Sequence, residues 1–239
     1  MYVKTRGVVL HTLKFSETSV ISRIYTEELG LVSYIVKGVR SAKSQQKAIL
    51  LQPLSILDLE VNHRENKQLQ FIKEFSRAFN YQSIPFETLK SAIAVFMLEV
   101  ISKSIREHEP NHEMFQFIIR ALINLDLSEK LNPDFHLSFL VHFSSYLGFM
   151  PHGNYSASHP NFALGEGVFV SSQSECECLN PRESELIHKL ISGPPFNPIG
   201  YPITRLERKR MLNNLSKYYA LHLDNFVLKS PEILEELLD

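Results

Sequence analysis

Apolar and polar residues alternate along most of the first 80 positions, which is the pattern of short strands with one buried face. The alternation occurs in segments separated by polar or glycine-containing turns. The predicted strands cover residues 7–13, 20–26, 30–36, 56–61 and 69–72. Five short strands are too few for two packed sheets, so we expect them to close into a small barrel without free edges.

After Pro85 the apolar residues recur every three or four positions, which predicts helices for much of the remaining chain. Cap residues, prolines and glycines supply their start and stop signals. The predicted helices run from 86 to about 105, from Asn111 to about 123, from Asn132-Pro133 to Gly148, from Asn180-Pro181 to Gly193, and from the Thr204–Glu207 capping box to about Leu223. Between about 149 and 179 the pattern breaks down, and only 168–170 resembles a strand.

These elements predict an α+β protein. We expect an N-terminal five-stranded β-barrel of the oligonucleotide/oligosaccharide-binding (OB) type at residues 1–80. An α-helical region should follow at residues 81–239, with a small irregular insertion at about 149–179. Periodicity alone does not separate an OB barrel from an SH3-like barrel.

Charge is distributed unevenly, although the formal net charge is only −1. Residues 1–80 carry twelve Lys/Arg and seven Asp/Glu, a net +5. Residues 81–150 and 151–239 each carry a net −3. A basic N-terminal part joined to an acidic remainder suggests a polyanionic ligand at the N-terminal end.

The segment after the third predicted strand holds four cations on a loop rich in Ser, Gln and Gly. No acidic residue occurs between Glu28 and Asp58, so these cations repel one another unless an anion lies among them. A phosphate backbone is the natural candidate, and a solvated surface loop is the alternative. Tyr25 and Tyr34 are aromatic rings that either stack on bases or belong to the barrel core. The residues predicted to contact DNA are Lys37, Arg40, Lys43, Lys47, Arg6, Arg23 and Tyr34.

A second basic cluster opens the last long predicted helix. Cations at a helix N-terminus oppose the helix dipole, at a cost of about 0.3–1 kcal/mol each when exposed. The cluster is therefore a candidate site for an acidic partner, and salt bridges to the acidic remainder of the chain are the alternative. Its predicted partner-binding residues are Arg205, Arg208, Lys209, Arg210 and Leu212, with Met211 and Leu215 completing an apolar groove.

Two short motifs resemble catalytic signatures without supporting the chemistry. The segment His108–His112 matches the H-E-x-x-H pattern, but Pro110 between the histidines breaks the continuous helix that a shared zinc requires. Asp58 with Glu65 and Lys67 resembles a metal-dependent nuclease triad, but the last two fall at a predicted hairpin turn. No phosphate-binding G-x-x-x-x-G-K-[ST] loop occurs. We therefore predict no catalytic residues, no cofactor and no metal.

The cysteine content and the N-terminal sequence indicate in which cellular compartment the protein is expected. Cys176 and Cys178 are the only cysteines, too few for a disulfide framework, and two ordinary thiols are expected. A four-ligand zinc site with His152 and His159 is the weaker alternative, because no C-x-x-C pair occurs. The N-terminus lacks a signal-peptide core, and no apolar run is long enough for a membrane span. These features predict a cytoplasmic protein.

The chain resembles the RecO family of bacterial recombination mediators along nearly its whole length. In the N-terminal part the matching residues are Thr5-x-Gly7-Val8-Val9-Leu10, Glu17-x-Ser19, Thr26-x-x-x-Gly30, Lys37-Gly38-x-Arg40 and Leu51-x-Pro53. Later matches are Tyr146-Leu147-Gly148-Phe149-x-Pro151, Tyr218-Tyr219-x-x-His222-Leu223 and Lys229-Ser230. Many family members carry two C-x-x-C pairs where this sequence has His152, Cys176 and Cys178, so we predict no zinc site.

The resemblance implies an N-terminal OB fold, a helical C-terminal region and annealing of complementary single strands. It implies work in DNA recombination and repair with a RecR-type partner and with the acidic C-terminal tail of single-stranded DNA-binding protein. The expected ligand is single-stranded DNA, with duplex DNA as a second candidate, and the expected location is bacterial cytoplasm near the nucleoid. A metal-dependent nuclease and a protein–protein adaptor without DNA contact are the competing hypotheses.

Overall fold

The computed structural model describes residues 1–39, 45–64, 67–106, 109–171, 177–198 and 200–237. The contacts divide the chain into two compact units. Unit 1 comprises residues 1–82 and 101–123, and unit 2 comprises residues 83–100 and 124–239. The domain boundary predicted near residue 80 stays a prediction.

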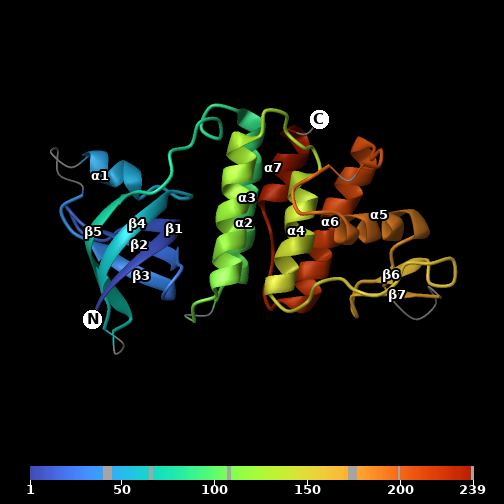
Figure 1. The fold of residues 1–239 in the computed structure, drawn as a ribbon, viewed down its shortest axis with the longest axis horizontal. Coiled ribbons are helices and arrows are strands. Elements are labelled where there is room, and N and C mark those ends of the chain that lie inside the picture. The colour runs from blue at the N-terminus through green and yellow to red at the C-terminus, as the bar shows by residue number, and fades with distance from the viewer. Residues whose placement is uncertain (40–44, 65–66, 107–108, 172–176, 199, 238–239) are drawn as a thin grey trace. The chain divides into compact units, whose positions relative to one another are not determined.

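The N-terminal strands form a closed barrel, which confirms the predicted α+β class and OB-type architecture (Figure 1). The strands are β1 (Tyr2–Lys14), β2 (Val20–Thr26), β3 (Gly30–Val36), β4 (Ile56–Asn62) and β5 (Leu69–Arg77). Their order around the barrel is β1-β2-β3-β5-β4, with β4 pairing back to β1. Among the five described barrel strands, β3 and β5 are the one parallel pair, and they are joined through a connection that includes β4.

The barrel interior is filled by the alternate residues of each strand, as a period of two requires. Its core residues are Val9, Val20, Ile24, Val32, Tyr34, Val36, Val39, Leu51, Leu57, Leu59 and Val61. Gly7 allows the strands to approach closely, because a Cβ there would lie 2.6 Å from Ile24 Cγ2 and 3.0 Å from Leu59 Cδ1. The absence of a side chain at Gly7 therefore lets Ile24 and Leu59 pack against β1 where the barrel closes.

The helix α3 (His112–Leu127) covers part of the barrel within unit 1. Phe115 packs against Tyr25 with ring centroids 6.0 Å apart, and both rings are fully buried. The Tyr25 hydroxyl donates to the Asn111 carbonyl at 3.3 Å. The side chain of Asn111 also accepts from the Met114 N–H at 2.9 Å, so the predicted helix cap is confirmed.

Unit 2 is mainly helical, with one small hairpin. Its elements beyond the shared helix α2 (Thr88–Ser104) are α4 (Phe135–Tyr146), β6 (Asn161–Ala163), β7 (Val168–Val170), α5 (Pro181–Ser192), α6 (Arg205–His222) and α7 (Ser230–Leu237). Capping boxes at Asn180 and Thr204 open α5 and α6 as predicted. The α7 N-terminus is held by Glu99 of α2, whose carboxylate accepts from the backbone N–H groups of Lys229 and Ser230.

Several elements differ from the sequence predictions. A short helix α1 (Gln45–Leu50) stands where the basic loop was expected to continue, so Lys47 lies on a helix. The third helix begins at Phe135, because the Asn132 side chain accepts from the Asp134 N–H at 3.0 Å and forms a turn ahead of it. The strand β6 and the helix α7 were not predicted. None of the helices in the described part of the chain combines the length and hydropathy needed to cross a bilayer.

Candidate nucleic-acid interface

The neighbouring strands β1, β2, β3 and β5 carry two outward-facing rows of side chains. One row consists of Leu13, Ile21, Ile35 and Phe71, and the other consists of His11, Arg23, Ser33 and Leu69. We call these eight residues the outer face, although Ile35 is buried at 9% exposure. The row between them, which includes Ser22, Tyr34 and Gln70, is buried inside the barrel, so the alternation is consistent across the strands. None of the eight residues is acidic.

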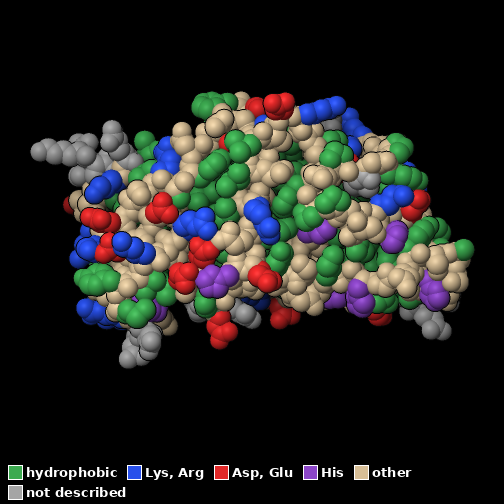
Figure 2. Space-filling view, viewed as in Figure 1, with side chains coloured by type: hydrophobic (Ala, Val, Ile, Leu, Met, Phe, Trp, Pro, Cys, Tyr) green, Lys and Arg blue, Asp and Glu red, His purple; other side chains and the backbone are tan. Residues whose placement is uncertain are grey.

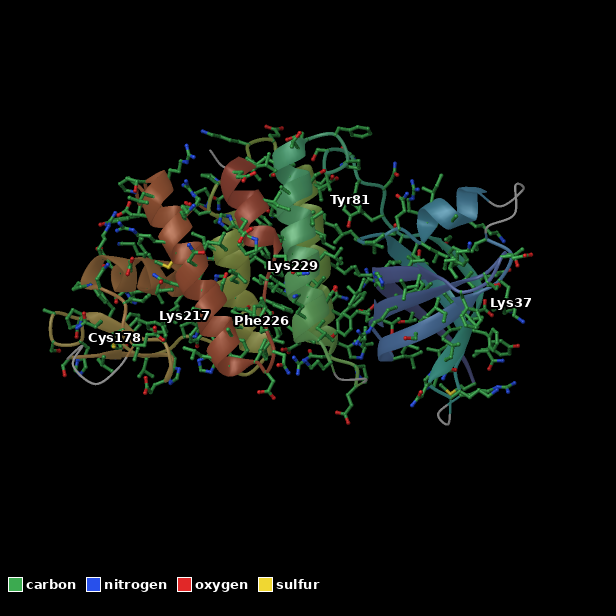
Figure 3. All side chains as sticks on the ribbon, turned by 180° about the vertical axis from the view of Figure 1, so that it is seen from behind. Lys37, Tyr81, Cys178, Lys217, Phe226 and Lys229 are labelled. Carbon is green, nitrogen blue, oxygen red and sulfur yellow. The ribbon has the colours of Figure 1, made fainter. Side chains whose placement is uncertain are left out.

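Exposed apolar and cationic side chains meet at the two ends of the outer face. At one end Phe71 is 45% exposed, and the Lys37 ammonium lies 5.4 Å from its ring centroid (Figure 3 labels Lys37 on the barrel). Beyond the other end, where β1 stops at Lys14, Phe15 is 56% exposed and follows the exposed Lys14 directly. Arg23 is exposed between them. A surface that joins aromatic rings to cations is suited to nucleotides, which pair a flat base with a phosphate.

Four of the predicted DNA contacts lie on or near the outer face or outside the described residues. Arg23 and Lys37 are exposed on or beside the outer face. Arg40 and Lys43 lie outside the described residues. Sequence reasoning missed the exposed aromatic and apolar members of the face. The signal that could have found them is strand parity, because Phe71 occupies an outward position beside the inward Gln70.

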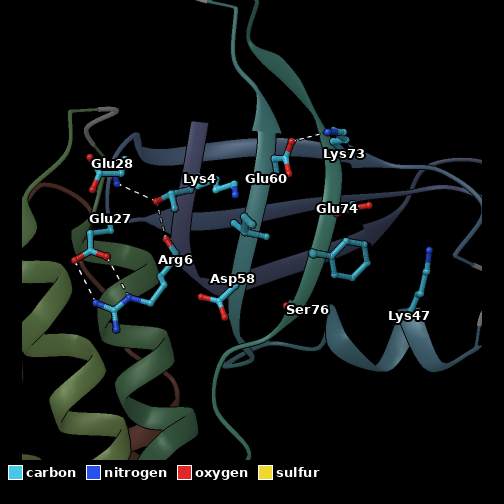
Figure 4. A pocket seen from close by; sticks show the side chains of 13 residues that line it. Lys4, Arg6, Glu27, Glu28, Lys47, Asp58, Glu60, Lys73, Glu74 and Ser76 are labelled. Carbon is cyan, nitrogen blue, oxygen red and sulfur yellow. Dashed lines mark hydrogen bonds and ion pairs between the residues drawn. The ribbon is translucent and has the colours of Figure 1, made fainter. Parts of the chain in front are cut away.

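Two other predicted DNA contacts, Arg6 and Lys47, line a different region of the barrel. It is a groove of about 730 Å³ over β1, β4 and β5. Its charged residues are Lys4, Arg6, Lys47, Lys73, Glu27, Glu28, Asp58, Glu60 and Glu74 (Figure 4). Opposite charges face each other in register, since Lys4 pairs with Glu60 and Arg6 with Asp58 across β1 and β4. The space-filling view shows the same mixture of acids and bases over the barrel (Figure 2).

This mixed-charge groove is a poor path for a phosphate backbone. Five carboxylates outnumber four cations along its lining, so the local charge repels a polyanion. The exposed Lys73 is paired with the half-buried Glu60 at 2.6 Å, and that contact lowers the pKa of the Glu60 carboxyl and raises the pKa of Lys73. The DNA contacts of Arg6 and Lys47 stay predictions, and the carboxylates around them argue against both.

Arg6 has a structural role that explains its position. Its Nε and Nη2 atoms donate to the Glu27 carboxylate at 3.2 and 3.3 Å, and its guanidinium lies 5.9 Å from the Phe115 ring centroid. Gln116 of α3 also donates to Glu27. Arg6 therefore helps to hold α3 on the barrel within unit 1.

The two tyrosines considered for base stacking belong to the core. Tyr25 and Tyr34 are both 0% exposed. Burial raises the pKa of each hydroxyl well above its ordinary value. The expectation that Tyr34 contacts DNA is therefore wrong, because its ring lies inside the barrel.

The basic cluster on α6 also differs from its prediction. The Arg208 Nε atom donates to Asp134 Oδ1 at 2.8 Å, and the two side chains are only 13% and 9% exposed. Met211, Leu212 and Leu215 are at most 1% exposed, so the expected apolar groove is packed core and Leu212 is not available to a partner. Arg205, Lys209 and Arg210 remain exposed. The exposed apolar residue beside them is Leu206, at 57%.

The start of α6 is fixed by a network around Glu207. The Arg182 Nε atom donates to Glu207 at 2.8 Å, and the Thr204 backbone and hydroxyl donate to the same carboxylate. These contacts, with Arg182 the largest cause, lower the pKa of Glu207 to about 2. The dipole cost of the cationic first turn is thus offset by an acid at the third position.

The residues considered for zinc binding do not converge in the part of the chain that the structure describes. Within it, no group of three or more His, Cys, Asp or Glu side chains is arranged to hold a metal ion. His152 Nδ1 lies 3.3 Å from the Met150 carbonyl, and His159 Nδ1 lies 3.0 Å from the Ser158 hydroxyl. Cys178 is disulfide-bonded, which corrects the expectation of an ordinary thiol there. Cys176, His108 and Glu65 lie outside the described residues.

Comparison with known proteins covers both parts of the chain. The family model described as "Recombination protein O N terminal" matches residues 1–80, and the one described as "Recombination protein O C terminal" matches residues 86–232. The chain is 36% identical to the "DNA repair protein RecO" of Phocaeicola vulgatus over 99% of both proteins. It is 36% identical to the protein of that name from Flavobacterium psychrophilum, over 99% of this chain and 98% of the relative. The chain belongs to the recombination protein O (RecO) family.

Proposed function

We propose that the chain binds single-stranded DNA on the outer face of its barrel and anneals complementary strands during DNA recombination and repair. The observation that carries the proposal is the acid-free outer face, where Arg23 and the neighbouring Lys37 accompany the exposed ring of Phe71. Membership of the RecO family and the names of the relatives support a role in DNA repair. Arg40 and Lys43 follow β3 in sequence, and we include them among the phosphate contacts.

Annealing requires only non-covalent contacts, and the outer face offers contacts of the required kind. Two strands must have their phosphates neutralised while their base-pairing edges remain free. Contacts from Arg23 and Lys37 to phosphates, and contacts from aromatic rings to base faces, leave those edges unused. The proposed activity therefore needs no bond-making step and no catalytic residue.

A nuclease is not favoured by the positions of the candidate residues. Asp58 lies in the middle of β4, and Lys67 lies in the turn beyond the end of that strand at Asn62. Four residues of extended strand span roughly 13 Å, too far for the two groups to act on one phosphate. Asp58 also lies in the mixed-charge groove.

We also propose two protein partners, a RecR-type protein and the acidic tail of single-stranded DNA-binding protein. The tail site is placed on the exposed first turns of α6. Leu206, Lys209 and Arg210 are exposed, and their spacing puts them on one side of the helix. An apolar residue flanked by cations suits an acidic peptide that ends in an apolar side chain.

The DNA part of the proposal is tested by annealing of two complementary oligonucleotides, one carrying a fluorophore and the other a quencher. We expect the wild-type protein to accelerate annealing and the variant Arg23→Gln/Lys37→Gln to lose most of that acceleration. The matched control is Lys4→Gln/Lys73→Gln, which removes two cations of the mixed-charge groove. Equal loss in both variants, or cleavage of the strands in Mg²⁺, would contradict the proposal.

The tail site is tested separately with a fluorescent acidic peptide that ends in phenylalanine. The variant Lys209→Glu/Arg210→Glu should lose peptide binding and keep its affinity for single-stranded DNA. Lys130→Glu is the control, because Lys130 is an exposed cation elsewhere in unit 2. Unchanged peptide affinity in the double variant would place the tail on another surface.

A further inference from the structure

The exposed aromatic residues of the barrel have cations beside them, and this combination favours one kind of ligand. An apolar surface of this kind could receive an apolar protein, but cations accompany it at both ends. Lys37 lies over the Phe71 ring at 5.4 Å, and Lys14 precedes Phe15 directly. Arg23 lies in the adjoining row. Since neither row contains an acid, charge complementarity favours a ligand that is both anionic and flat-faced.

We infer that Phe71 and Phe15 are base-stacking positions that make the barrel prefer single-stranded to duplex DNA. This inference rests on the proposed function and deepens it. A nucleotide of a single strand can place its base on an exposed ring, whereas a base within a duplex is already stacked on its neighbours. Stacking uses the flat face of any base, so the contact is tolerant of sequence.

The pairing of Lys37 with Phe71 matches the two parts of a single nucleotide. The ring offers its face to the base, and the ammonium can move from the ring to the phosphate of the same nucleotide. Phe71 and Leu13 are separated by three strand-to-strand steps in their row. At about 4.8 Å a step, Phe71 and Leu13 are roughly 14 Å apart. Phe15 follows Leu13 by two residues, just beyond the end of β1 at Lys14, so we assign it to a different nucleotide from Phe71.

Affinity measurements separate stacking from charge. We expect Phe71→Leu to lower the affinity for oligo(dT) by about 5- to 150-fold, the range expected for loss of one stacked base. The affinity for an abasic deoxyribose-phosphate chain should not change, and neither should the affinity for duplex DNA. Phe86→Leu is the matched control, because Phe86 is 81% exposed and lies in unit 2.

A second readout does not depend on the loss of a side chain. The chain contains no tryptophan, so Phe71→Trp introduces a single indole, excited selectively at the red edge of protein absorption, at the inferred stacking position. Oligo(dT) should quench this fluorescence at saturation, and the abasic chain should not. The fluorescence of Phe86→Trp should not be quenched by either.

The outcomes distinguish failure of this inference from failure of the proposed function. If wild type binds neither oligo(dT) nor the abasic chain at low salt, the proposed function itself is wrong. If wild type binds both but Phe71→Leu has no effect and Phe71→Trp is not quenched, the inference is overturned, and the apolar row is assigned to a protein partner. Equal losses for oligo(dT), the abasic chain and duplex DNA would also overturn it, because stacking cannot act on a chain without bases.

Discussion

Replacing Arg208 with methionine tests whether this residue of the basic α6 cluster is structural. The substitution keeps an unbranched apolar stem but removes the partner of Asp134, whose side chain is only 9% exposed. Removing one member of a buried ion pair costs about 3–5 kcal/mol, because the remaining charge has lost its compensation. The free energy of unfolding falls by about 2–3 kcal/mol for each M of urea. The urea concentration at the midpoint of unfolding should therefore be lower by about 1–2.5 M in the variant.

The assay is urea unfolding followed by circular dichroism at pH 7, with two comparison variants. Lys209→Met changes the exposed neighbouring cation and should shift the unfolding free energy by less than about 0.5 kcal/mol. Asp134→Leu/Arg208→Met removes both charges and should recover most of the stability lost by Arg208→Met alone. A midpoint for Arg208→Met equal to that of Lys209→Met would refute the reasoning and return Arg208 to the surface available to partners.

Three further predictions concern the interior. Lys90, 2% exposed, donates to the Ser128 carbonyl at 2.8 Å and to the Asp126 carbonyl at 3.3 Å, so Lys90→Met should cost at least about 1–3 kcal/mol of unfolding free energy in urea. Gly7→Val should cost about 1–3 kcal/mol or prevent barrel closure, measured by thermal unfolding, since Gly7 has no room for a larger side chain. Burial, with a smaller contribution from the Arg208 charge, lowers the pKa of His136 from 6.5 to about 3. Because the unfolded chain takes up that proton first, stability should fall as pH drops from 6.5 towards 3, by about 1.4 kcal/mol per pH unit below pH 6. Between pH 6 and pH 5 the slope should be smaller by about 1.4 kcal/mol per pH unit in His136→Leu.

The strand pattern and cap signals predicted most of the fold because they are local properties. Alternation from Val20 to Thr26 and from Gly30 to Val36 matches β2 and β3 residue for residue. The capping boxes at Asn180 and Thr204 are complete in sequence and form as expected. In contrast, α7 was missed although Ser230, Pro231 and Glu232 form a local start signal. Its other N-terminal contact, Glu99, is about 130 positions away and could not be read from the local sequence.

The candidate site was harder to predict because charge and aromaticity do not indicate exposure. Tyr34 and Phe71 are both aromatic residues in strands, yet one is 0% and the other 45% exposed. The alternation of side chains along each strand, together with the parallel pairing of β3 with β5, determines that Tyr34 points inward and Phe71 points outward. Likewise, the cluster on α6 was evident in the sequence, but the ion pair of Arg208 with the distant Asp134 was not. Only the folded structure shows which cations form ion pairs with acids distant in the sequence and which cations face solvent.

The salt dependence of single-stranded DNA binding tests the central claim most directly. The variant Arg23→Gln/Lys37→Gln removes two cations from the DNA path, so the slope of log K against log salt should become shallower by about 1.4, at about 0.7 for each phosphate contact. The control Lys4→Gln/Lys73→Gln removes two cations from the mixed-charge groove and should leave the slope unchanged. A slope that changes in the groove variant and not in the outer-face variant would contradict the account.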